Sequence, residues 1–537
     1  MKKIEDKISD FGEFVEKNYK VFFAIILALA VLLNTYKLGE VPSGIDCDEA
    51  GMNMDAYYIA NYGVDRFCKK NPVYFINFGD GQNALYTYLN AFILKLFKVN
   101  NYFTMRLPAL ILSIIEVVVC YLLVKEFRSK KEALLFMLLV TISPWHIMKS
   151  RWALESYLLS PMLLFSIYLL VNAIKANKHK LLKFAISGLI FGITLYTYAI
   201  SYIIIPIFLL LMLLYLIRKK QIKISQIIVF IVPLFILALP LILMLMVQHG
   251  WIDEINSFIT IPKLLFYRGS DLDITNIFTN LKSLKEVLWC DTLNYNSLEG
   301  YGTLYYFGTI AMIIGTLITI IKMIKQSNNE NQNEDIKTKE WKIKKKENIN
   351  IDLDIIMLLI FASNLILAIF TKLNANRLNG IYISATYFEL VTLRYFYKNI
   401  KVVFYALLIA YLTAFMLFIK SYFFDHADEY KPFWDNGAVE LMTYLNKFEG
   451  KMIHADNILY IYNLYANKIP PEEFNKNKVI TGVKVSGYNN YDGRPIDIND
   501  CNTNDVYVTT NLEKARAMVK IYKFEMEIFN NMYYILY

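Results

Sequence analysis

Four consecutive residues near the N-terminus, Asp46-Cys47-Asp48-Glu49, bring three carboxyl groups together just after a hydrophobic run. A carboxylate can act as a general base toward a hydroxyl or an amine. Further along the chain, arginine recurs in the short polar segments that border other hydrophobic runs, as Arg106, Arg151 and Arg377. Because a planar guanidinium group binds phosphate through paired hydrogen bonds, these residue types together indicate chemistry on a phosphate-bearing substrate.

The composition predicts a polytopic membrane protein. Of the 537 residues, 56% are hydrophobic and only 19% are charged, and the mean hydropathy is +0.36. A soluble domain of this length carries more charge. The net charge of +9 is spread over basic clusters at regular intervals, which favours cytoplasmic loops over a nucleic-acid surface. We therefore expect membrane lipids, and no nucleic acid, as partners.

The hydrophobic runs predict about eleven transmembrane helices. They occupy residues 20–37, 107–125, 132–147, 153–174, 183–199, 201–217, 225–247, 303–325, 352–371, 378–393 and 401–424. Every second connection between these runs carries a basic cluster, so the positive-inside rule places the N-terminus in the cytoplasm and the C-terminus outside the plasma membrane. This alternation requires the split between 183–199 and 201–217. A shorter run at 84–97 predicts an interfacial helix.

Two domains follow from this pattern. Residues 1–424 would form the helical membrane domain, with a long first outer loop at 38–106. Residues 425–537 lose the long apolar runs and would form a small α/β domain outside the membrane. There, strand-like runs at 457–462 and 505–510 alternate with helical patches at 438–448 and 512–522.

The topology gathers polar residues at the outer membrane face. They are Asp46, Asp48, Glu49, Gln82, Arg106, His146, Arg151, Glu155, Asn374, Asn376 and Arg377. Ionisable groups at membrane depth are costly and usually have a partner or a function. Structural alternatives remain, because Asp48-Glu49 could cap a helix, the arginines could anchor headgroups, and His146 could be a structural or an interfacial residue.

The order and spacing of these motifs resemble a known family. The segments at 42–50, 79–89 and 103–108 resemble the first outer loop of the dolichyl-phosphate-mannose protein mannosyltransferases (glycosyltransferase family 39) and their bacterial relatives. The segment from Ser143 to Glu155 resembles the second outer motif of that family. Asn376-Arg377-Leu-Asn379 is similar to a late motif of bacterial members.

The resemblance implies a GT-C fold and inverting transfer of a sugar from a polyprenyl-phosphate donor. By position, Asp48 matches the catalytic aspartate, Glu49 lies beside it, and Glu155 stands where relatives usually carry a second aspartate. The donor phosphate would bind Arg106, Arg151 and Arg377. The remaining residues assigned to the substrate pocket are Asp46, Gln82, Tyr86, His146 and Asn376.

Two departures limit the acceptor. Relatives that transfer aminoarabinose to lipid A carry a Lys-Pro-Pro motif, whereas this chain has Asp80-Gly-Gln-Asn-Ala84, so that acceptor is not supported. The segment 248–302 is too short for the large outer insert of the eukaryotic enzymes. We therefore expect an envelope glycan, lipid or protein as acceptor. No cofactor is implied with certainty, although clustered carboxylates could hold a divalent metal.

Two rival functions remain. A transporter or flippase for a lipid-linked sugar would share the spans, but would place ionisable groups near mid-membrane in repeated halves. An adhesive or sensor protein with an outer domain would not need the polar residues to converge. Charges at the outer ends of the spans, and the lack of an internal repeat in the sequence, favour the transferase.

Overall fold

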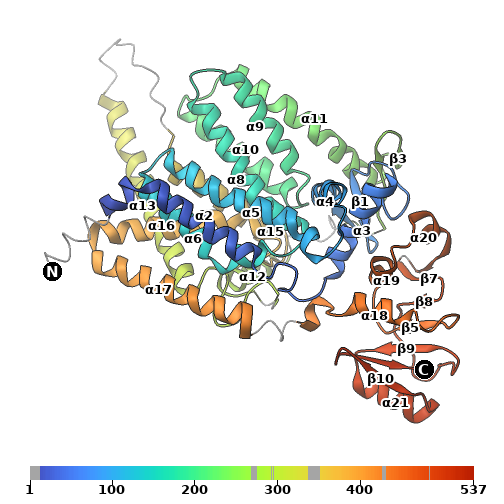
Figure 1. Ribbon diagram of the computed structural model, residues 1–537. Coiled ribbons are helices and arrows are strands. Elements are labelled where there is room, and N and C mark those ends of the chain that lie inside the picture. Colours follow the sequence, from blue (N-terminus) through green and yellow to red (C-terminus); the bar gives the residue numbers. More distant parts are fainter. Residues whose placement is uncertain are drawn as a thin grey trace. The chain divides into compact units, whose positions relative to one another are not determined.

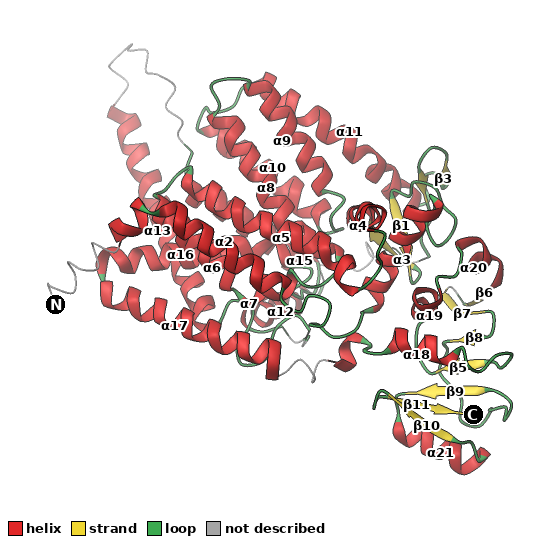
Figure 2. Ribbon diagram, viewed as in Figure 1, coloured by secondary structure: helices red, strands yellow, loops and turns green. Residues whose placement is uncertain are grey.

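The structure is a computed structural model, mostly helical, with a strand-rich segment near the C-terminus (Figures 1 and 2). It describes residues 12–265, 267, 275–291, 293, 295–336, 351–425, 431–482 and 484–537. The chain forms two compact units. The first comprises Met1–Tyr36, Ala109–Leu239 and Ser270–Phe424, and the second comprises Lys37–Pro108, Pro240–Gly269 and Asp425–Tyr537.

Helices make up the first unit, and two of them, α5 and α11, continue into the second. The α-helices are α2 (Tyr19–Thr35), α5 (Tyr102–Lys125), α6 (Lys130–Ile142), α7 (Pro144–Lys149), α8 (Leu159–Lys175), α9 (Lys180–Thr194), α10 (Ser201–Arg218), α11 (Ile224–Gln248), α12 (Ile277–Trp289), α13 (Tyr306–Ile336), α14 (Leu353–Leu365), α15 (Leu367–Phe370), α16 (Tyr382–Asn399) and α17 (Lys401–Lys420). Short 3-10 helices, η1 (Glu155–Leu158) and η4 (Asn379–Ile381), precede α8 and α16, and a π-helical turn, η5 (Ser421–Asp425), follows α17. Each of the eleven predicted runs coincides with a helix. The predicted split is also confirmed, because α9 and α10 are separate helices.

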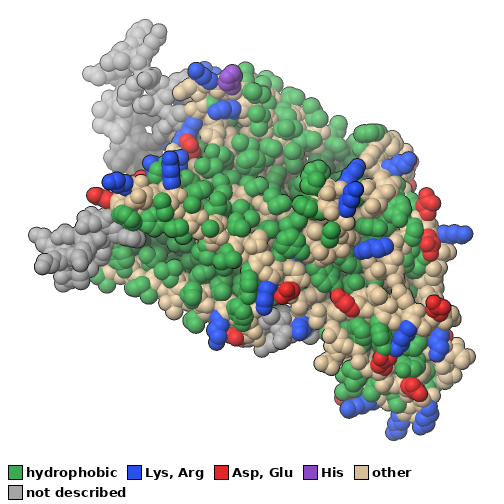
Figure 3. Space-filling model, viewed as in Figure 1, with side chains coloured by type: hydrophobic (Ala, Val, Ile, Leu, Met, Phe, Trp, Pro, Cys, Tyr) green, Lys and Arg blue, Asp and Glu red, His purple; other side chains and the backbone are tan. Residues whose placement is uncertain are grey.

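The chain is a multi-pass membrane protein. Seven helices in the described part of the chain are long and apolar enough to cross a bilayer: residues 102–125, 155–175, 201–218, 224–248, 306–325, 353–370 and 401–425. Helices α2 and α4 (Ala84–Phe97) are apolar but shorter. Figure 3 shows hydrophobic side chains over much of the visible face of the helices, as expected for lipid-facing surface. The exact number of spans stays a prediction.

Small residues allow close helix packing in the first unit. Helix α13 packs on α16, and α8 packs on α9. At Gly315 in α13, an added Cβ would lie 1.9 Å from the carbonyl oxygen of Phe388 in α16. Only glycine permits so close a backbone approach, which is a common device in membrane helix pairs.

The segment predicted to be the first outer loop, residues 38–106, contains two helices and a hairpin within the second unit. Helix α3 (Cys47–Tyr62) is followed by strands β1 (Tyr74–Asn77) and β2 (Asp80–Asn83), then by α4. The structure confirms a helix over the predicted residues 84–97. A further two-stranded ribbon, β3 (Ile255–Asn256) and β4 (Thr260–Ile261), belongs to the same unit.

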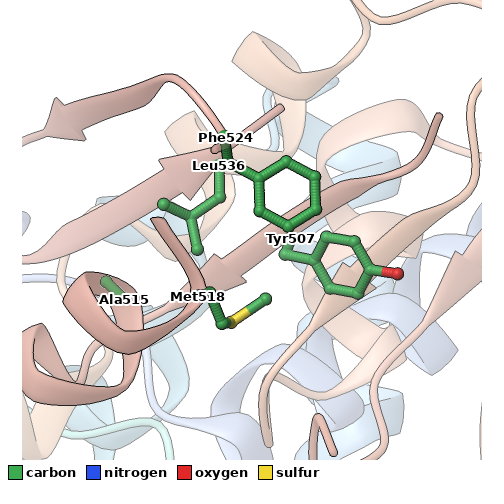
Figure 4. Close-up of a cluster of buried hydrophobic side chains, with 5 residues drawn as sticks. All are labelled: Tyr507, Ala515, Met518, Phe524 and Leu536. Atoms are coloured by element: carbon green, nitrogen blue, oxygen red, sulfur yellow. The ribbon is translucent and has the colours of Figure 1, made fainter. Parts of the chain in front are cut away.

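The C-terminal segment contains a seven-stranded mixed sheet with the order β10-β11-β9-β5-β8-β7-β6. Its strands are β5 (Ile453–Ala455), β6 (Lys478–Thr481), β7 (Lys484–Tyr488), β8 (Tyr491–Asp492), β9 (Val506–Thr509), β10 (Met526–Phe529) and β11 (Tyr533–Leu536). Its helices are η6 (Lys431–Trp434), α18 (Ala438–Leu445), α19 (Tyr460–Asn467), α20 (Pro471–Asn477) and α21 (Leu512–Tyr522). Figure 4 shows the core that α21 closes against β9 and β11, built from Tyr507, Ala515, Met518, Phe524 and Leu536.

One predicted strand in this segment is wrong. The run at 457–462 alternates in hydrophobicity, yet helix α19 begins at Tyr460. Tyr460, Ile461 and Leu464 are all buried, which is the spacing of a helix face rather than of a strand. The other three predictions hold, because β9 and helices α18 and α21 lie within the predicted ranges.

The compact units divide the chain differently from the predicted domains. The segment from Asp425 does belong to the second unit, but so does the first outer loop. Hydrogen bonds join them: the Tyr58 hydroxyl donates to the Ile469 carbonyl at 2.6 Å, and the Asn475 amide donates to the Arg66 carbonyl at 2.7 Å. Such long-range contacts cannot be read from local composition.

Candidate active site

The acidic motif starts helix α3. Asp46 is the N-cap residue, and its Oδ1 accepts the backbone N–H of Asp48 at 2.9 Å. Glu49 completes a capping box by accepting the N–H of Asp46 through Oε2 at 3.3 Å. The alternative that Asp48-Glu49 caps a helix is therefore correct for Glu49, whereas the N-cap residue itself is Asp46 and not Asp48. The same geometry fixes Asp48 in the first turn of α3.

Glu49 also forms a buried ion pair with Arg106, and both side chains are fully buried. The Nε and Nη2 atoms of Arg106 donate to the two carboxylate oxygens of Glu49 at 3.0 Å each. The remaining donors bond the carbonyls of Leu38, Pro42 and Gly44, each at 2.9 Å. All five N–H donors of Arg106 are therefore engaged.

This arrangement favours a structural role for Arg106. A phosphate could bind its guanidinium group only by displacing Glu49 or a backbone carbonyl, and each would then be left buried without its partner. A headgroup anchor would need an exposed guanidinium group, whereas the guanidinium group of Arg106 is fully buried. Arg106 instead ties the entry of the outer loop, at residues 38–44, to α3.

Asp48 is half-buried, like Asp46, and a polar network orients its side chain. Its Oδ1 accepts the side-chain amide of Asn77 at 2.8 Å. The Oδ1 atom of Asn77 in turn accepts Arg66 Nη2 at 3.2 Å, and Arg66 makes a bidentate pair with Asp55 at 3.0 and 2.7 Å. Arg66 thereby fixes the amide of Asn77 so that its N–H group faces Asp48.

The pKa of Asp46 differs from that of an ordinary aspartate. Burial raises the pKa of Asp46 well above its usual range, and the neighbouring negative charges, first Asp48 and then Glu49 and Asp435, raise it further. Asp435 itself accepts the hydroxyl of Tyr462. When Asp46 is protonated, its Oδ1 can still accept the N–H group of Asp48, and the electrostatic repulsion between the two side chains is smaller.

Two further predicted pocket residues lie in this unit. Gln82 is on β2 opposite Phe75 and is 4% exposed. Tyr86 is on α4, is fully buried, and donates its hydroxyl to the Met105 carbonyl at 2.9 Å. The tyrosine therefore supports the start of α5, and the substrate contacts of both residues stay predictions.

In the first unit, Arg151 caps a helix. Its Nη1 donates to the carbonyls of Leu33 and Asn34 at 2.9 and 3.2 Å, and its Nη2 donates to the carbonyl of Tyr36 at 2.6 Å. These carbonyls belong to the C-terminal end of α2, where helices leave acceptors unpaired. Because Arg151 is fully buried, the structure favours helix capping over the predicted phosphate contact.

Glu155 and His146 are both buried in this unit. Glu155 is the first residue of η1 and is 5% exposed. His146 lies on α7, with Nε2 3.3 Å from the Ser113 carbonyl oxygen and 3.6 Å from Oε2 of Glu116. His146 is thus part of a buried polar group, which agrees with the structural alternative.

The sequence prediction missed Lys149 at the end of α7. Its Nζ donates to the Tyr157 hydroxyl at 2.8 Å, to Asn296 Oδ1 at 2.7 Å and to Asn376 Oδ1 at 3.0 Å. Arg377, next to Asn376, is half-buried and donates from Nη1 to Thr371 Oγ1 at 2.6 Å and to the Lys372 carbonyl at 3.0 Å. The position of Lys149 between His146 and Arg151, inside the motif from Ser143 to Glu155, was the available signal.

The predicted metal has no fitting ligand set. Among the residues that the structure describes, no group of three or more His, Cys, Asp or Glu side chains could hold a metal ion. The carboxylates of the motif serve instead as a helix cap and an ion-pair partner. We derive no step through a metal, and the divalent ion stays a prediction.

Comparison with known proteins adds a family and a fold. Residues 83–245 match the family model described as dolichyl-phosphate-mannose-protein mannosyltransferase. The predicted resemblance is confirmed. No curated protein matches the sequence.

The fold is similar to that of ArnT from Cupriavidus metallidurans bound to undecaprenyl phosphate, with a TM-score of 0.54 at 10% identity over 96% of this chain and 97% of that one. The apo state of that protein gives 0.53 at 7% identity, over 97% and 98%. These likenesses confirm the GT-C fold. An oligosaccharyltransferase from Archaeoglobus fulgidus gives 0.46 at 11% identity over 84% of this chain, which spans only 64% of that protein.

Proposed function

We propose that this chain is a membrane glycosyltransferase that moves a sugar from a polyprenyl-phosphate donor to an acceptor of the cell envelope. The observation that carries the proposal is the carboxylate of Asp48, which Asn77 orients at the start of α3. Two comparisons support the donor class: the matched family is named for a dolichyl-phosphate sugar, and ArnT was solved with undecaprenyl phosphate.

In the proposed reaction, Asp48 takes the proton from an acceptor hydroxyl. The acceptor oxygen then attacks the anomeric carbon from the side opposite the phosphate, and the carbon–oxygen bond to the phosphate breaks. The bonding electrons leave with the phosphate, so the products are the glycosylated acceptor and the polyprenyl phosphate, with inverted configuration. Cationic groups beside the phosphate assist this step, because charge develops there.

The phosphate side of the site differs from the one that the motifs predicted. Arg106 and Arg151 bond carbonyl groups and are fully buried, so Arg377 is the arginine that we retain for the donor phosphate. Glu155 remains our candidate for the second acidic group. We further propose that the protein lies in the plasma membrane, with a cytoplasmic N-terminus and an extracytoplasmic C-terminal segment, which agrees with the basic connections.

The test is transfer by the purified chain in proteoliposomes. A panel of radiolabelled polyprenyl-phosphate sugars would be offered together with the envelope fraction of the source organism as acceptor. We expect label in the acceptor from one donor class. If labelled lipid instead crosses the bilayer without any transfer, the flippase alternative replaces this proposal.

Asn77 provides a graded prediction. We expect Asn77→Ala to lower kcat by roughly 10- to 100-fold, since a misplaced base loses its alignment with the acceptor proton. Donor KM should change little, because Asn77 contacts Asp48 and Arg66. Asn61→Ala, which changes an exposed asparagine on α3, the helix that carries Asp48, is the control. A rise in KM at constant kcat would show that Asn77 binds substrate instead of positioning Asp48.

A further inference from the structure

Lys149 is a buried cation, and among the residues that the structure describes its hydrogen-bond partners are all neutral. Its Nζ atom is held by oxygens from three different segments: Tyr157 in η1, Asn296 after α12, and Asn376 before η4. The residue is 5% exposed, and the ring of Tyr157 lies 4.3 Å from Nζ. Three separate segments therefore converge on one ammonium group.

A buried ammonium group without a counter-ion is costly. Burial lowers the pKa of Lys149 to about 7, and the charge of Asp291 opposes this shift. Asp291 makes no direct contact with Lys149 within the described residues. Its carboxylate accepts the Asn296 amide at 3.2 Å and the backbone N–H of Ala375 at 2.5 Å. The amide of Asn296 thus separates the two charges.

The cluster has one side that reaches the surface. Tyr157 and Asn296 are buried, whereas Asn376 and the adjacent Arg377 are half-buried. The cavity behind Lys149, lined by Ser113, Glu116 and His146, has room for about one water molecule and is too small for a phosphate group. An anion would therefore approach from the side of Asn376.

We propose that Lys149, together with Asn376 and Arg377, binds the phosphate group of the lipid-linked substrate. A phosphate oxygen would replace the amide oxygen of Asn376 as acceptor for Nζ, and the freed amide could rotate to donate to the same anion. This exchange gives the ammonium group the charged partner that the described residues do not supply. The inference rests on the proposed function, because it names the group that holds the donor.

The test is binding of undecaprenyl phosphate to the full-length protein in phosphatidylcholine nanodiscs. We expect Lys149→Met to bind roughly 10- to 100-fold more weakly than wild type, the loss expected for one hydrogen bond between charged groups. Lys149→Arg should keep most of the affinity. Lys372→Met removes the same charge from an exposed position of the neighbouring loop and should bind like wild type.

Additional arms identify the ligand and guard against misfolding. Inorganic phosphate and phosphatidylglycerol, tested separately, distinguish a free anion or an ordinary headgroup from the polyprenyl form. Asn376→Ala, which changes a half-buried loop residue, is the substitute variant if Lys149→Met proves unstable. We expect Asn376→Ala to weaken binding of undecaprenyl phosphate several-fold. Thermal unfolding of each variant shows whether it is folded.

Two outcomes would overturn the inference. One is a folded Lys149→Met protein that binds undecaprenyl phosphate as tightly as wild type. The other is an equal loss of affinity for undecaprenyl phosphate in Lys372→Met, which would show that the effect comes from net charge alone. Asp48→Asn should bind like wild type and fail only in transfer. Transfer that depends on Asp48 but not on Lys149 would therefore reject this inference and leave the proposed function standing.

Discussion

Asp48→Asn is expected to reduce sugar transfer by about 100- to 10,000-fold, the range that a positioned general base contributes. The substitution keeps the size of the side chain, and its amide oxygen can still accept the N–H group of Asn77. The substitution removes the negative charge and with it the ability to take a proton. Replacing one charge in the first turn of α3 should cost about 0.3–1 kcal/mol in helix stability, too little to unfold the protein.

The measurement is initial transfer rate at saturating donor, with thermal unfolding of the same samples. Asp65→Asn is the matched control in the same loop. Burial raises the pKa of Asp65 to about 7, so the neutral amide resembles its protonated form, and Oδ1 can still accept the N–H groups of Phe67 and Lys69. Asp65→Asn should keep near-wild-type rates. If Asp48→Asn retained more than a tenth of the activity, another group would have to be the base.

Arg106→Met is expected to destabilise the protein by about 3–5 kcal/mol, because it leaves Glu49 as a buried charge without its partner. Three backbone carbonyls would lose their donors as well. We expect a large loss of folded protein after extraction, and a lower unfolding temperature for what remains. Arg106→Lys should rescue little, since an ammonium group has three donors and cannot replace a five-donor fork.

The double variant Glu49→Leu with Arg106→Met separates the two explanations. Removing both charges avoids the unpaired carboxylate, so the double variant should be more stable than Arg106→Met alone. If Arg106 bound the donor phosphate instead, Arg106→Met would be normally folded and would bind undecaprenyl phosphate weakly. Thermal unfolding and lipid binding on the same preparations distinguish these results.

The helices were predictable because apolar length is a local property of the sequence. All eleven apolar runs became helices, and the separation of α9 from α10 followed from the alternation of basic connections. The run at 457–462 misled because a short apolar alternation is compatible with a strand or with a buried helix face. Tertiary contacts decide between them, and these are absent from the local pattern.

The site was predictable in its residue types but not in its pairings. The pair Asp46 and Glu49 predicts a helix cap because the two residues have the spacing of a capping box. The partners of Arg106 and Arg151 are mostly backbone carbonyls, which every residue carries, so no side-chain pattern reveals them. Lys149 was missed for a different reason: two of its side-chain partners, Asn296 and Asn376, are distant in sequence.

The bond between Glu49 and Arg106 also sets an order of events during synthesis. The two residues are 57 positions apart, so at about 5–20 residues per second the ribosome adds Arg106 roughly 3–11 s after Glu49. During that interval α3 can form its cap, but Glu49 has no guanidinium partner and cannot be buried at low cost. The loop must therefore stay open in the nascent chain until the beginning of α5 has been made.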